Sequence, residues 1–205
     1  MKTEILSSDS SVALTSALSV LSSGGLVAFP TDTVYGLGAL AFDAEAVKTI
    51  YTVKGRPAEK GIPILLGDVD DLFKVTSNTP KMALRLIARF WPGPLTLVLP
   101  KISTLPEAVS GTATVAVRVP DHLVARTLLR AAGPMAVTSA NLSGEPSPST
   151  AQTVFAQLGG RISLILDGGK SPGDIPSTVV DCTGTQPVIL RAGPISREEL
   201  FSALA

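Results

Sequence analysis

Residues 139–144, with the sequence SANLSG, place hydroxyl and amide side chains directly after an apolar run at 134–137. The apolar run predicts a buried strand, so these polar groups gather where the strand ends, which is where open α/β sheets bind ligands. A second polar cluster, KGRP at 54–57, also lies in a loop beside a predicted strand and carries two cations. Two cations together with a Ser-x-Asn sequence indicate a pocket for an anion with several hydrogen-bond acceptors.

Two further arginines belong to apolar runs. Arg118 lies within the run 116–119, and Arg191 directly follows the run 188–190. An arginine in such a place either pairs with a buried carboxylate or reaches into a pocket, and for each residue alone both alternatives stay open. Lys54 and Arg56 alone could equally stand on a solvated loop. Taken together, the four cations favour a site for a polyanion.

Hydroxyl side chains occupy comparable positions. Thr31 and Thr33 follow a predicted strand, Ser177 opens another, and Ser139 stands two residues before Asn141. Each of them could instead cap a helix or satisfy a turn. As a set they would supply neutral donors and acceptors for a small polar substrate beside a phosphate chain.

Several common catalytic motifs do not fit the sequence. The segment 168–171, GGKS, lacks the glycine that a P-loop needs at position 164, and prolines follow it where a helix should begin. With one histidine and one cysteine in the chain, neither a zinc site nor a Ser-His-Asp triad is indicated. Cys182 is expected to be a buried, inert thiol, and His122 a solvated residue at a helix start.

The composition favours one compact cytosolic domain. The 205 residues are 45% apolar and 17% charged, and their formal net charge is zero. No apolar run approaches the ~20 residues of a spanning helix, and no signal peptide is expected at the N-terminus. A balanced charge does not favour a general basic surface for nucleic acid, although a local basic cleft stays open.

Helical and strand patterns alternate along the chain. Helices are expected after caps at Asp9 or Ser10, at Asp43, at Asp121 and at Ser149 or Thr150, and also at 80–90. Strands are expected at 26–29, 62–66, 95–99, 114–119, 134–137, 162–166, 178–182 and 188–190, with none in the glycine-punctuated segment 31–38. Because several strands follow one another without a helix, we expect an α/β domain with a mixed sheet.

The polar segments together resemble the YrdC/Sua5 family, the threonylcarbamoyl-AMP synthases. The segments that carry this resemblance occur in the family's order at 30–38, 54–57, 91–96, 118–120, 139–144, 177–179 and 191–193. The resemblance implies one YrdC-like catalytic domain over 1–205, with its core at about 10–200. Its fold would be a twisted, mostly mixed or antiparallel sheet flanked by helices, in the short form without a further C-terminal domain.

The resemblance also implies an activity and a site. The family joins L-threonine, bicarbonate and ATP into threonylcarbamoyl-adenylate, releases pyrophosphate, and so supplies N6-threonylcarbamoylation of adenosine 37 in tRNAs that read ANN codons. The implied catalytic residues are Lys54, Arg56, Ser139 and Asn141. The implied threonine ligands are Thr33, Arg118, Ser139 and Ser177. The implied nucleotide ligands are Arg56, Lys60, Thr114, Asn141, Ser149 and Arg191.

Two positions depart from the family's pattern. Some members carry histidine where this chain has Leu65, and Gly61 replaces a proline that is common in the family. Whether the side chain at position 65 contacts threonine therefore stays open, and the loop after Arg56 could be looser.

The implied mechanism relies on positioning and on fixed positive charge. Threonine's amine would attack carbon dioxide or bicarbonate, and the resulting carbamate would attack the α-phosphorus of ATP. Mg²⁺ would arrive on the phosphates, since the sequence offers no dedicated carboxylate cage. The adenylate would pass to the tRNA threonylcarbamoyl-transferase machinery, with weak RNA binding as a further expectation. Two alternatives stay open: an RNA-binding module with a basic cleft, and a related domain that forms carbamoyl-adenylate.

Overall fold

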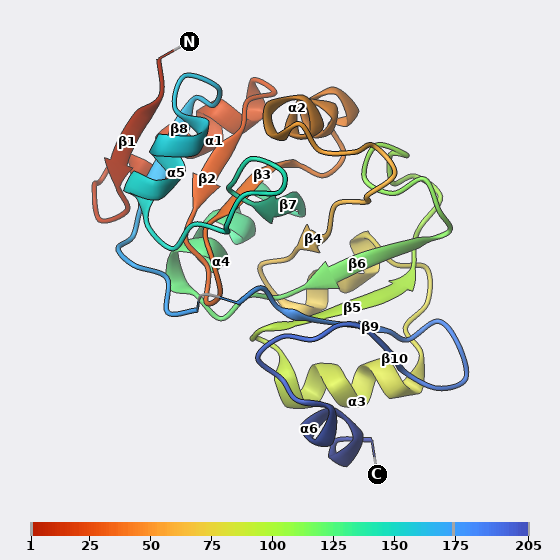
Figure 1. Cartoon of the computed structure of the whole chain (residues 1–205). Helices are drawn as coiled ribbons and strands as arrows, with labels where there is room; N and C mark the ends of the chain where they lie inside the picture. Colours follow the sequence, from red (N-terminus) through yellow and green to blue (C-terminus); the bar gives the residue numbers. More distant parts are fainter. Residues whose placement is uncertain (1, 174, 205) are drawn as a thin grey trace.

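The computed structural model describes residues 2–173 and 175–204, and its central feature is a mixed sheet (Figure 1). The ten strands found in these ranges lie in the order β1-β8-β2-β3-β7-β4-β6-β5-β9-β10. Their bounds are β1 Glu4–Ser7, β2 Val27–Phe29, β3 Gly36–Leu40, β4 Ile64–Leu65, β5 Leu95–Pro100, β6 Thr114–Arg118, β7 Met135–Ser139, β8 Leu164–Asp167, β9 Thr178–Asp181 and β10 Val188–Arg191. The helices are α1 Ala13–Ser22, α2 Ala44–Lys54, the 3₁₀ helix η1 Val69–Lys74, α3 Lys81–Phe90, α4 Leu123–Ala132, α5 Ala151–Leu158 and α6 Arg197–Ser202.

Parallel and antiparallel pairs both occur in this sheet, as the sequence predicts. Strand β8 runs parallel to its neighbours β1 and β2, while β3 is antiparallel to both β2 and β7. The short β4 joins the two halves of the sheet, because it pairs antiparallel with β7 and parallel with β6. Beyond β6, strand β5 is antiparallel, β9 is parallel to β5, and β10 closes the edge antiparallel to β9. The expected mixed α/β sheet in one domain is thus confirmed.

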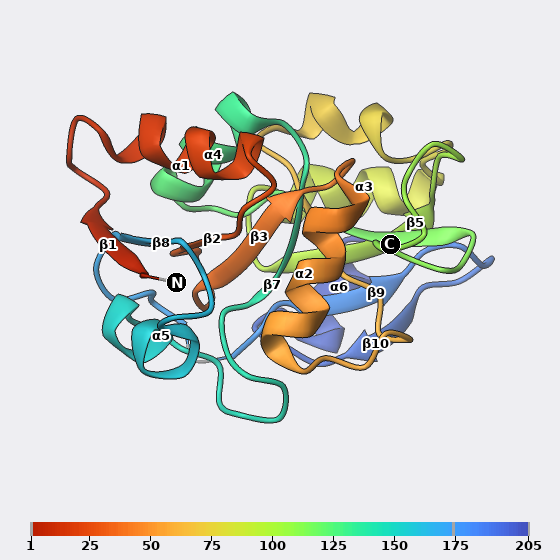
Figure 2. The same ribbon diagram turned by 90° about the horizontal axis from the view of Figure 1, so that it is seen from above.

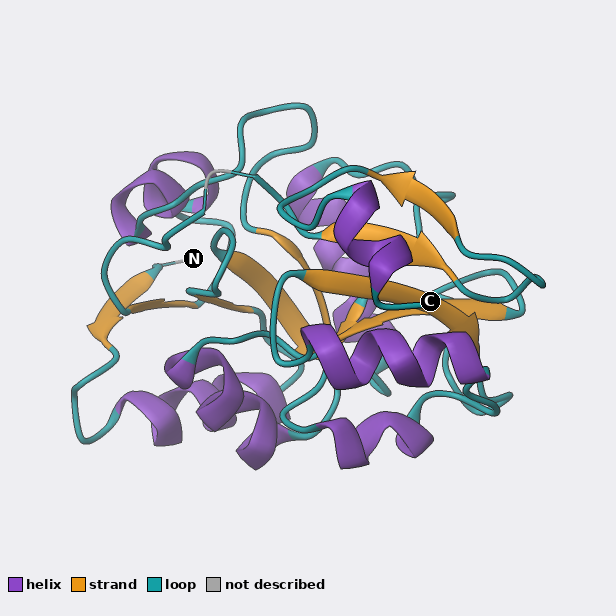
Figure 3. Ribbon diagram, turned by 90° about the horizontal axis from the view of Figure 1, so that it is seen from below, coloured by secondary structure: helices purple, strands orange, loops and turns teal. Residues whose placement is uncertain are grey.

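The alternation of side chains along the strands divides the core into two layers. In β2, Val27 and Phe29 pack with α1 and α4, while Ala28 belongs to the layer that contains α2 and α5. In β7, Val137 joins the first layer and Ala136 the second. This is the period of two that a strand imposes on its side chains. Figures 2 and 3 show the result, with helices on both faces of the sheet and α1 beside α4.

Local capping signals explain where some helices begin and end. Asp43 accepts a hydrogen bond from the Ala46 amide at 3.0 Å and so caps α2, as expected. Gly55 ends the same helix in the left-handed region at φ 59°. Thr150 caps α5 by accepting from the Thr153 amide at 3.2 Å. The two ends of α2 are therefore fixed, which sets the position of Lys54 and Arg56.

Two expected caps are wrong. Helix α4 begins after His122, not after Asp121, and His122 makes no side-chain cap bond. Helix α1 begins at Ala13 behind Val12, because residues 8–12 form turns, so neither Asp9 nor Ser10 caps it.

The segment 31–38 contains a strand that the sequence pattern does not predict. Its second half begins β3, and Gly36 and Gly38 lie against β7. A Cβ at Gly36 would lie 2.7 Å from Val137 Cγ1, and one at Gly38 would lie 2.9 Å from Met135 Cε. The glycines are therefore explained by close packing on this strand rather than by a turn. None of the helices within the described ranges is long and apolar enough to span a membrane.

Candidate active site

A pocket of about 290 Å³ lies where the two halves of the sheet meet. The loop between β2 and β3 supplies Thr33, the end of β6 supplies Arg118, and the end of β7 supplies Ser139. The segment before β9 supplies Ser177 and the end of β10 supplies Arg191. The described lining residues are Thr31, Thr33, Val34, Tyr35, Gly36, Arg56, Gly61, Pro63, Leu65, Thr96, Arg118, Val137, Thr138, Ser139, Pro176, Ser177 and Arg191. Polar groups that are far apart in the sequence therefore converge on one pocket.

Arg118 is held rigidly at the base of this pocket. Its Nε donates to the Gly93 carbonyl at 2.9 Å, Nη1 to Thr33 Oγ1 at 3.0 Å, and Nη2 to Asp32 Oδ1 at 2.5 Å. Burial lowers the pKa of Arg118, and the charge of Asp32 opposes that shift. A guanidinium carries five N–H groups, so these contacts with described residues leave two of them for a ligand. Of the two alternatives for this arginine, both hold: it pairs with a carboxylate, and it lines the pocket.

Arg191 and Ser177 form a second polar group on the pocket wall. Arg191 donates from Nε and Nη2 to the Ser177 carbonyl at 3.0 and 2.8 Å, and from Nη2 to Ser177 Oγ at 3.1 Å. The Nη1 nitrogen makes no bond in the described structure, which leaves both of its N–H groups for a ligand. Ser177 Oγ also lies 2.7 Å from Thr96 Oγ1, and both side chains are buried.

Arg56 is the third arginine that lines the pocket, beside Arg118 and Arg191. It stands after the end of α2, where Nε donates to the Lys60 carbonyl at 3.1 Å and Nη2 to the Gly61 carbonyl at 2.9 Å. These bonds fold the loop 56–61 around the guanidinium, so the side chain is half-buried rather than fully solvated. The pKa of Arg191 is lowered by its removal from water and then by the positive charges of Arg118 and Arg56. The mutual repulsion of these guanidinium groups is relieved when an anion enters.

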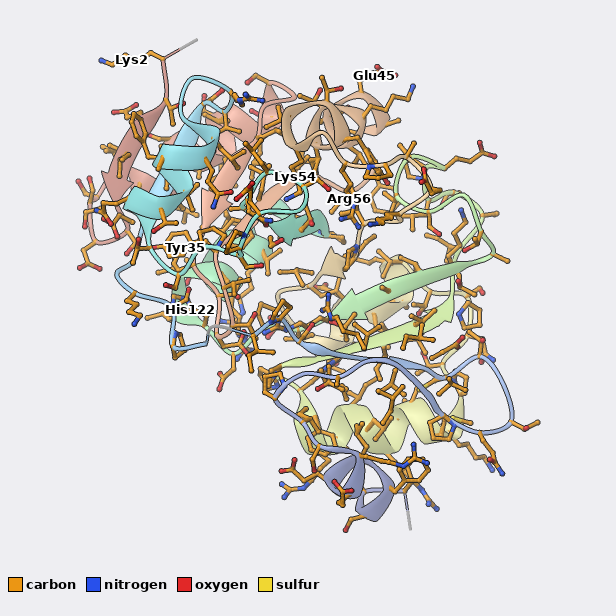
Figure 4. All side chains as sticks on the ribbon, viewed as in Figure 1. Lys2, Tyr35, Glu45, Lys54, Arg56 and His122 are labelled. Atoms are coloured by element: carbon orange, nitrogen blue, oxygen red, sulfur yellow. The ribbon has the colours of Figure 1, made fainter. Side chains whose placement is uncertain are left out.

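Lys54, labelled in Figure 4, is the last residue of α2. Its side chain is buried, and the residue is only 3% exposed. Its Nζ donates to the carbonyl of Ser139 at 2.5 Å and to the carbonyl and side-chain oxygen of Asn141. The Lys54 carbonyl in turn accepts from the Ser143 amide at 2.8 Å. Burial and the charge of Arg56 lower the pKa of Lys54 to about 7. In the described contacts this lysine holds the 139–143 loop and does not line the pocket.

Four other predicted site residues also lie outside the pocket lining. Asn141 is buried and donates from Nδ2 to the carbonyls of Leu142 and Glu145 at 2.8 and 2.7 Å. Lys60 is exposed, and its carbonyl holds Arg56. Thr114 opens β6 and Ser149 precedes α5, where the Ser149 carbonyl accepts from the Ser171 amide at 2.8 Å. Their predicted roles toward a nucleotide stay predictions.

The pocket also includes residues that the sequence reasoning did not single out. Tyr35 is fully buried, and its hydroxyl donates to the Gly169 carbonyl at 2.7 Å, which fastens the loop after β8 to the start of β3. Burial raises the Tyr35 pKa to about 12, so the phenol stays neutral. Val137 is a further such residue, and it provides an apolar wall together with Leu65. Tyr35 and Thr96 lie in the segments 30–38 and 91–96, which carry the family resemblance. Their place in these segments is the sequence signal that could have identified them as site residues.

The remaining reactive residues lie elsewhere. Burial raises the pKa of the Cys182 thiol to about 12, as expected for an inert cysteine. His122 is half-buried, and its Nδ1 has no hydrogen-bond partner among the described residues, so the expectation of a solvated side chain is wrong. No cluster of three or more His, Cys, Asp or Glu side chains suited to a metal ion occurs among the described residues.

Known proteins have sequences and a structure similar to those of this chain. The chain is 46% identical over 204 residues to threonylcarbamoyl-AMP synthase of Bacillus subtilis, with 98% of this chain and 58% of the relative covered. The enzyme of that name from Pyrococcus abyssi is 47% identical, with 86% of this chain and 53% of the relative covered. The structure of P. abyssi Sua5 complexed with L-threonine superimposes with a TM-score of 0.90 at 44% identity, covering 93% of this chain and 57% of that one. The chain thus spans little more than half the length of these relatives.

A family model gives the same result. The model for Sua5, YciO and YrdC proteins, whose description reads "telomere recombination", matches residues 19–193. That range includes β2 to β10 and every residue that lines the pocket. The chain therefore belongs to the Sua5/YciO/YrdC family.

Proposed function

We propose that this chain forms L-threonylcarbamoyl-adenylate from L-threonine, bicarbonate or carbon dioxide, and ATP, with release of pyrophosphate. The observation that carries the proposal is the convergence of Arg56, Arg118 and Arg191 on one pocket that also contains the hydroxyls of Thr33, Ser139 and Ser177. Such a pocket suits a substrate set that is rich in carboxylate and phosphate oxygens. Two relatives that bear the name threonylcarbamoyl-AMP synthase, and a related structure that holds L-threonine, support the same reaction.

The proposed chemistry needs positioning and charge stabilisation rather than a protein nucleophile. With carbon dioxide, the threonine nitrogen bonds to the carbon and loses a proton. With bicarbonate, the nitrogen bonds to the carbon while the hydroxyl group of bicarbonate leaves as water with a proton from the nitrogen. A carbamate oxygen then bonds to the α-phosphorus while the bond from that phosphorus to the bridging oxygen breaks, and pyrophosphate departs. The negative charge that builds on phosphate oxygens is stabilised by fixed donors.

Several pocket residues, and Lys54 outside the pocket lining, have proposed tasks in this scheme. Arg118 uses its two remaining N–H groups for the threonine carboxylate, next to Thr33. Arg56 and the free Nη1 of Arg191 face the phosphates. Leu65 and Val137 receive the substrate's methyl group, since their side chains form the apolar wall. Lys54 acts through Ser139 and Asn141, whose backbone oxygens it binds.

We propose that Mg²⁺ enters as part of the MgATP substrate. The lining contributes guanidinium groups, hydroxyls and apolar side chains, with no carboxylate among the described lining residues. This donor set suits phosphate oxygens rather than a resident cation. Chelation by EDTA should stop turnover and excess Mg²⁺ should restore it, whereas titration of the protein with Mg²⁺ alone should give no saturable heat.

The downstream partner is also a proposal. The adenylate is a mixed anhydride that water can hydrolyse, so a tRNA threonylcarbamoyl-transferase would need to receive it promptly, and the cytosol is the proposed location. Weak tRNA binding beside the pocket remains part of this proposal. A test is whether purified transferase modifies tRNA when it is supplied with this protein and the three substrates.

The direct test of the activity is mass spectrometry of the reaction mixture. Incubation with ATP, L-threonine and ¹³C-bicarbonate should yield a species with the mass of threonylcarbamoyl-adenylate that carries the label. Replacement of threonine and bicarbonate by carbamoyl phosphate tests the related carbamoyl-adenylate reaction, and a product only in that second mixture would reassign the substrate.

The RNA-binding alternative predicts a different result. A module that grips an RNA backbone should lose affinity steeply as salt rises. The arginines of this pocket are partly occupied by backbone and carboxylate partners, and the formal net charge of the chain is zero. We therefore prefer the enzyme. Tight RNA binding with a steep salt slope, without ATP turnover, would favour the alternative.

A further inference from the structure

Thr96 and Ser177 form a hydroxyl pair on the pocket wall, with 2.7 Å between their side-chain oxygens. Thr96 lies on β5, between β6, which ends at Arg118, and β9, which begins just after Ser177. Thr96 is 2% exposed and Ser177 is 4% exposed, and both line the pocket. The pair is thus shielded from bulk water but open to a bound molecule.

The hydrogens of this pair can be counted. Two hydroxyls carry two O–H hydrogens, and their mutual bond uses one of them, whichever atom donates. Arg191 Nη2 donates to Ser177 Oγ at 3.1 Å, so that oxygen accepts from a permanent cation. If Thr96 donates to Ser177 as well, the serine oxygen accepts twice and its own hydrogen is free. If Ser177 donates, the hydrogen of Thr96 is free instead.

Either arrangement leaves one O–H hydrogen without a partner among the described contacts of these residues, while Arg191 fills an acceptor position of Ser177. We infer that Thr96 is a positioning residue of the amino-acid site, which fixes the Ser177 hydroxyl as a donor toward a carboxylate oxygen of the substrate. A donor at this place complements the adjacent Arg118 guanidinium, because both then meet the same anionic group. This inference rests on the proposed function. It adds Thr96 as the residue that makes the Ser177 hydroxyl a donor toward the substrate.

The test is a double-mutant cycle with Thr96→Val, Ser177→Ala and the combined variant. Thr96→Val keeps the shape of the side chain and removes its hydroxyl. It should raise KM for threonine by about tenfold, the effect of a lost or misdirected hydrogen bond to a charged group, with kcat and KM for ATP within about twofold of wild type. Ser177→Ala should cause a similar or larger change, and the double variant should be no worse than Ser177→Ala, because Thr96 acts through that hydroxyl.

Two controls separate positioning from a loss of structure. Thr96→Ser retains the hydroxyl and should recover most of the affinity for threonine. Thr76→Val removes the hydroxyl of another buried threonine, which bonds the Leu72 carbonyl at 2.9 Å outside the pocket lining, and should leave KM for threonine unchanged. If Thr96→Val cannot be purified folded, the comparison of Thr96→Ser and Thr96→Cys with wild type replaces it, and a threonine KM that follows hydrogen-bond strength supports the inference.

Each outcome of this experiment has one meaning. Additive effects of Thr96→Val and Ser177→Ala, or an unchanged threonine KM in Thr96→Val, overturn the positioning role while the product of the wild-type protein leaves the proposed function intact. If the wild-type protein makes no threonylcarbamoyl-adenylate, the proposed function fails. In that case calorimetric titration of wild type and Thr96→Val with L-threonine tests the pair, and equal binding by the two proteins overturns the inference.

Discussion

The hydrogen bonds that each cation of the site makes within the protein decide how many of its N–H groups remain for a ligand. Arg118 is bound to Asp32, Thr33 and Gly93, whereas Arg56 bonds only backbone carbonyls of its own loop. Arg56 therefore keeps more of its donors for a ligand, and its removal should leave the fold intact. Lys54 is the opposite case, because its three N–H groups meet three acceptors of the protein and none remains for a ligand.

Arg56→Ala should reduce adenylate formation by about 10²–10³-fold, the usual cost of a lost electrostatic donor. Pyrophosphate release at saturating threonine and ATP measures the effect, and circular dichroism verifies the fold. Arg161→Ala removes an arginine outside the pocket lining and is the matched control. Near-normal turnover by folded Arg56→Ala protein would remove this residue from the site.

Lys54 should make the stability of the fold depend on pH. Its folded pKa of about 7 lies below its ordinary value of 10.5, so the unfolded chain binds more protons between these values. Stability should therefore rise with pH across that window, by at most about 1.4 kcal/mol per pH unit, and stay at its lowest level below about pH 7, where both states bind the proton. Urea unfolding of wild type and Lys54→Met from pH 7 to 9.5 should show their difference growing in favour of wild type.

Lys48→Met is the matched control, because it removes an exposed lysine from the same helix. A constant difference between wild type and Lys54→Met over the whole range would contradict the proposed burial of a lysine charge.

At the scale of elements, one close backbone contact places Ser177 in the pocket. Gly193 follows β10 and lies against the segment before β9. A Cβ at this position would lie 2.3 Å from the Thr178 nitrogen and 2.6 Å from the Ser177 carbonyl carbon. Only a residue without a side chain allows β10 and the 176–178 segment to approach so closely, so Gly193 sets the place of Ser177.

Gly193→Ala should displace Ser177 and Arg191 together. We expect destabilisation of about 1–3 kcal/mol from the overpacked contact, and a larger loss of threonine-dependent turnover than of ATP binding. Gly111→Ala is the control, because a Cβ there meets nothing within 4 Å. Thermal unfolding and steady-state kinetics of both variants test this, and equal behaviour of the two would show that the approach at Gly193 is not tight.

The same scale explains what the sequence could predict. Asp43 and Thr150 were recognisable caps because the bond of a capping side chain closes within three residues. Strand β3 was not recognisable, since its glycines are explained by Val137 and Met135, a hundred residues away in the chain. In the site, the types of the cations were predictable, but the burial of Lys54 under residues 139–141 depends on how α2 meets β7, which no local pattern records.

Three of the 17 Lys and Arg residues of the whole molecule line one pocket, while its formal net charge is zero. Because Arg56, Arg118 and Arg191 repel one another without a ligand, anion binding should stabilise the folded protein. A ligand at 100 times its Kd adds about 2.7 kcal/mol to the free energy of unfolding.

MgATP and inorganic pyrophosphate should therefore raise Tm by several degrees, about 2–4 °C for each kcal/mol in a chain of this size. L-threonine should add to the shift by MgATP. Differential scanning fluorimetry measures this, with Arg56→Ala as the variant that should respond less. A Tm that no polyanion moves would show that the three guanidinium groups do not form one binding surface.

The position of β1 has a consequence for synthesis on the ribosome. Thr3 donates to the Ile162 carbonyl at 2.5 Å across 159 residues, and in the described sheet β1 pairs with β8. At ~5–20 residues per second of translation, roughly 10–30 s separate the emergence of the two strands. During that interval β1 and the β2 edge that β8 will cover stay unpaired in the nascent chain. Slower translation should lengthen this interval, and binding of nascent-chain chaperones to the first 30 residues should increase with it.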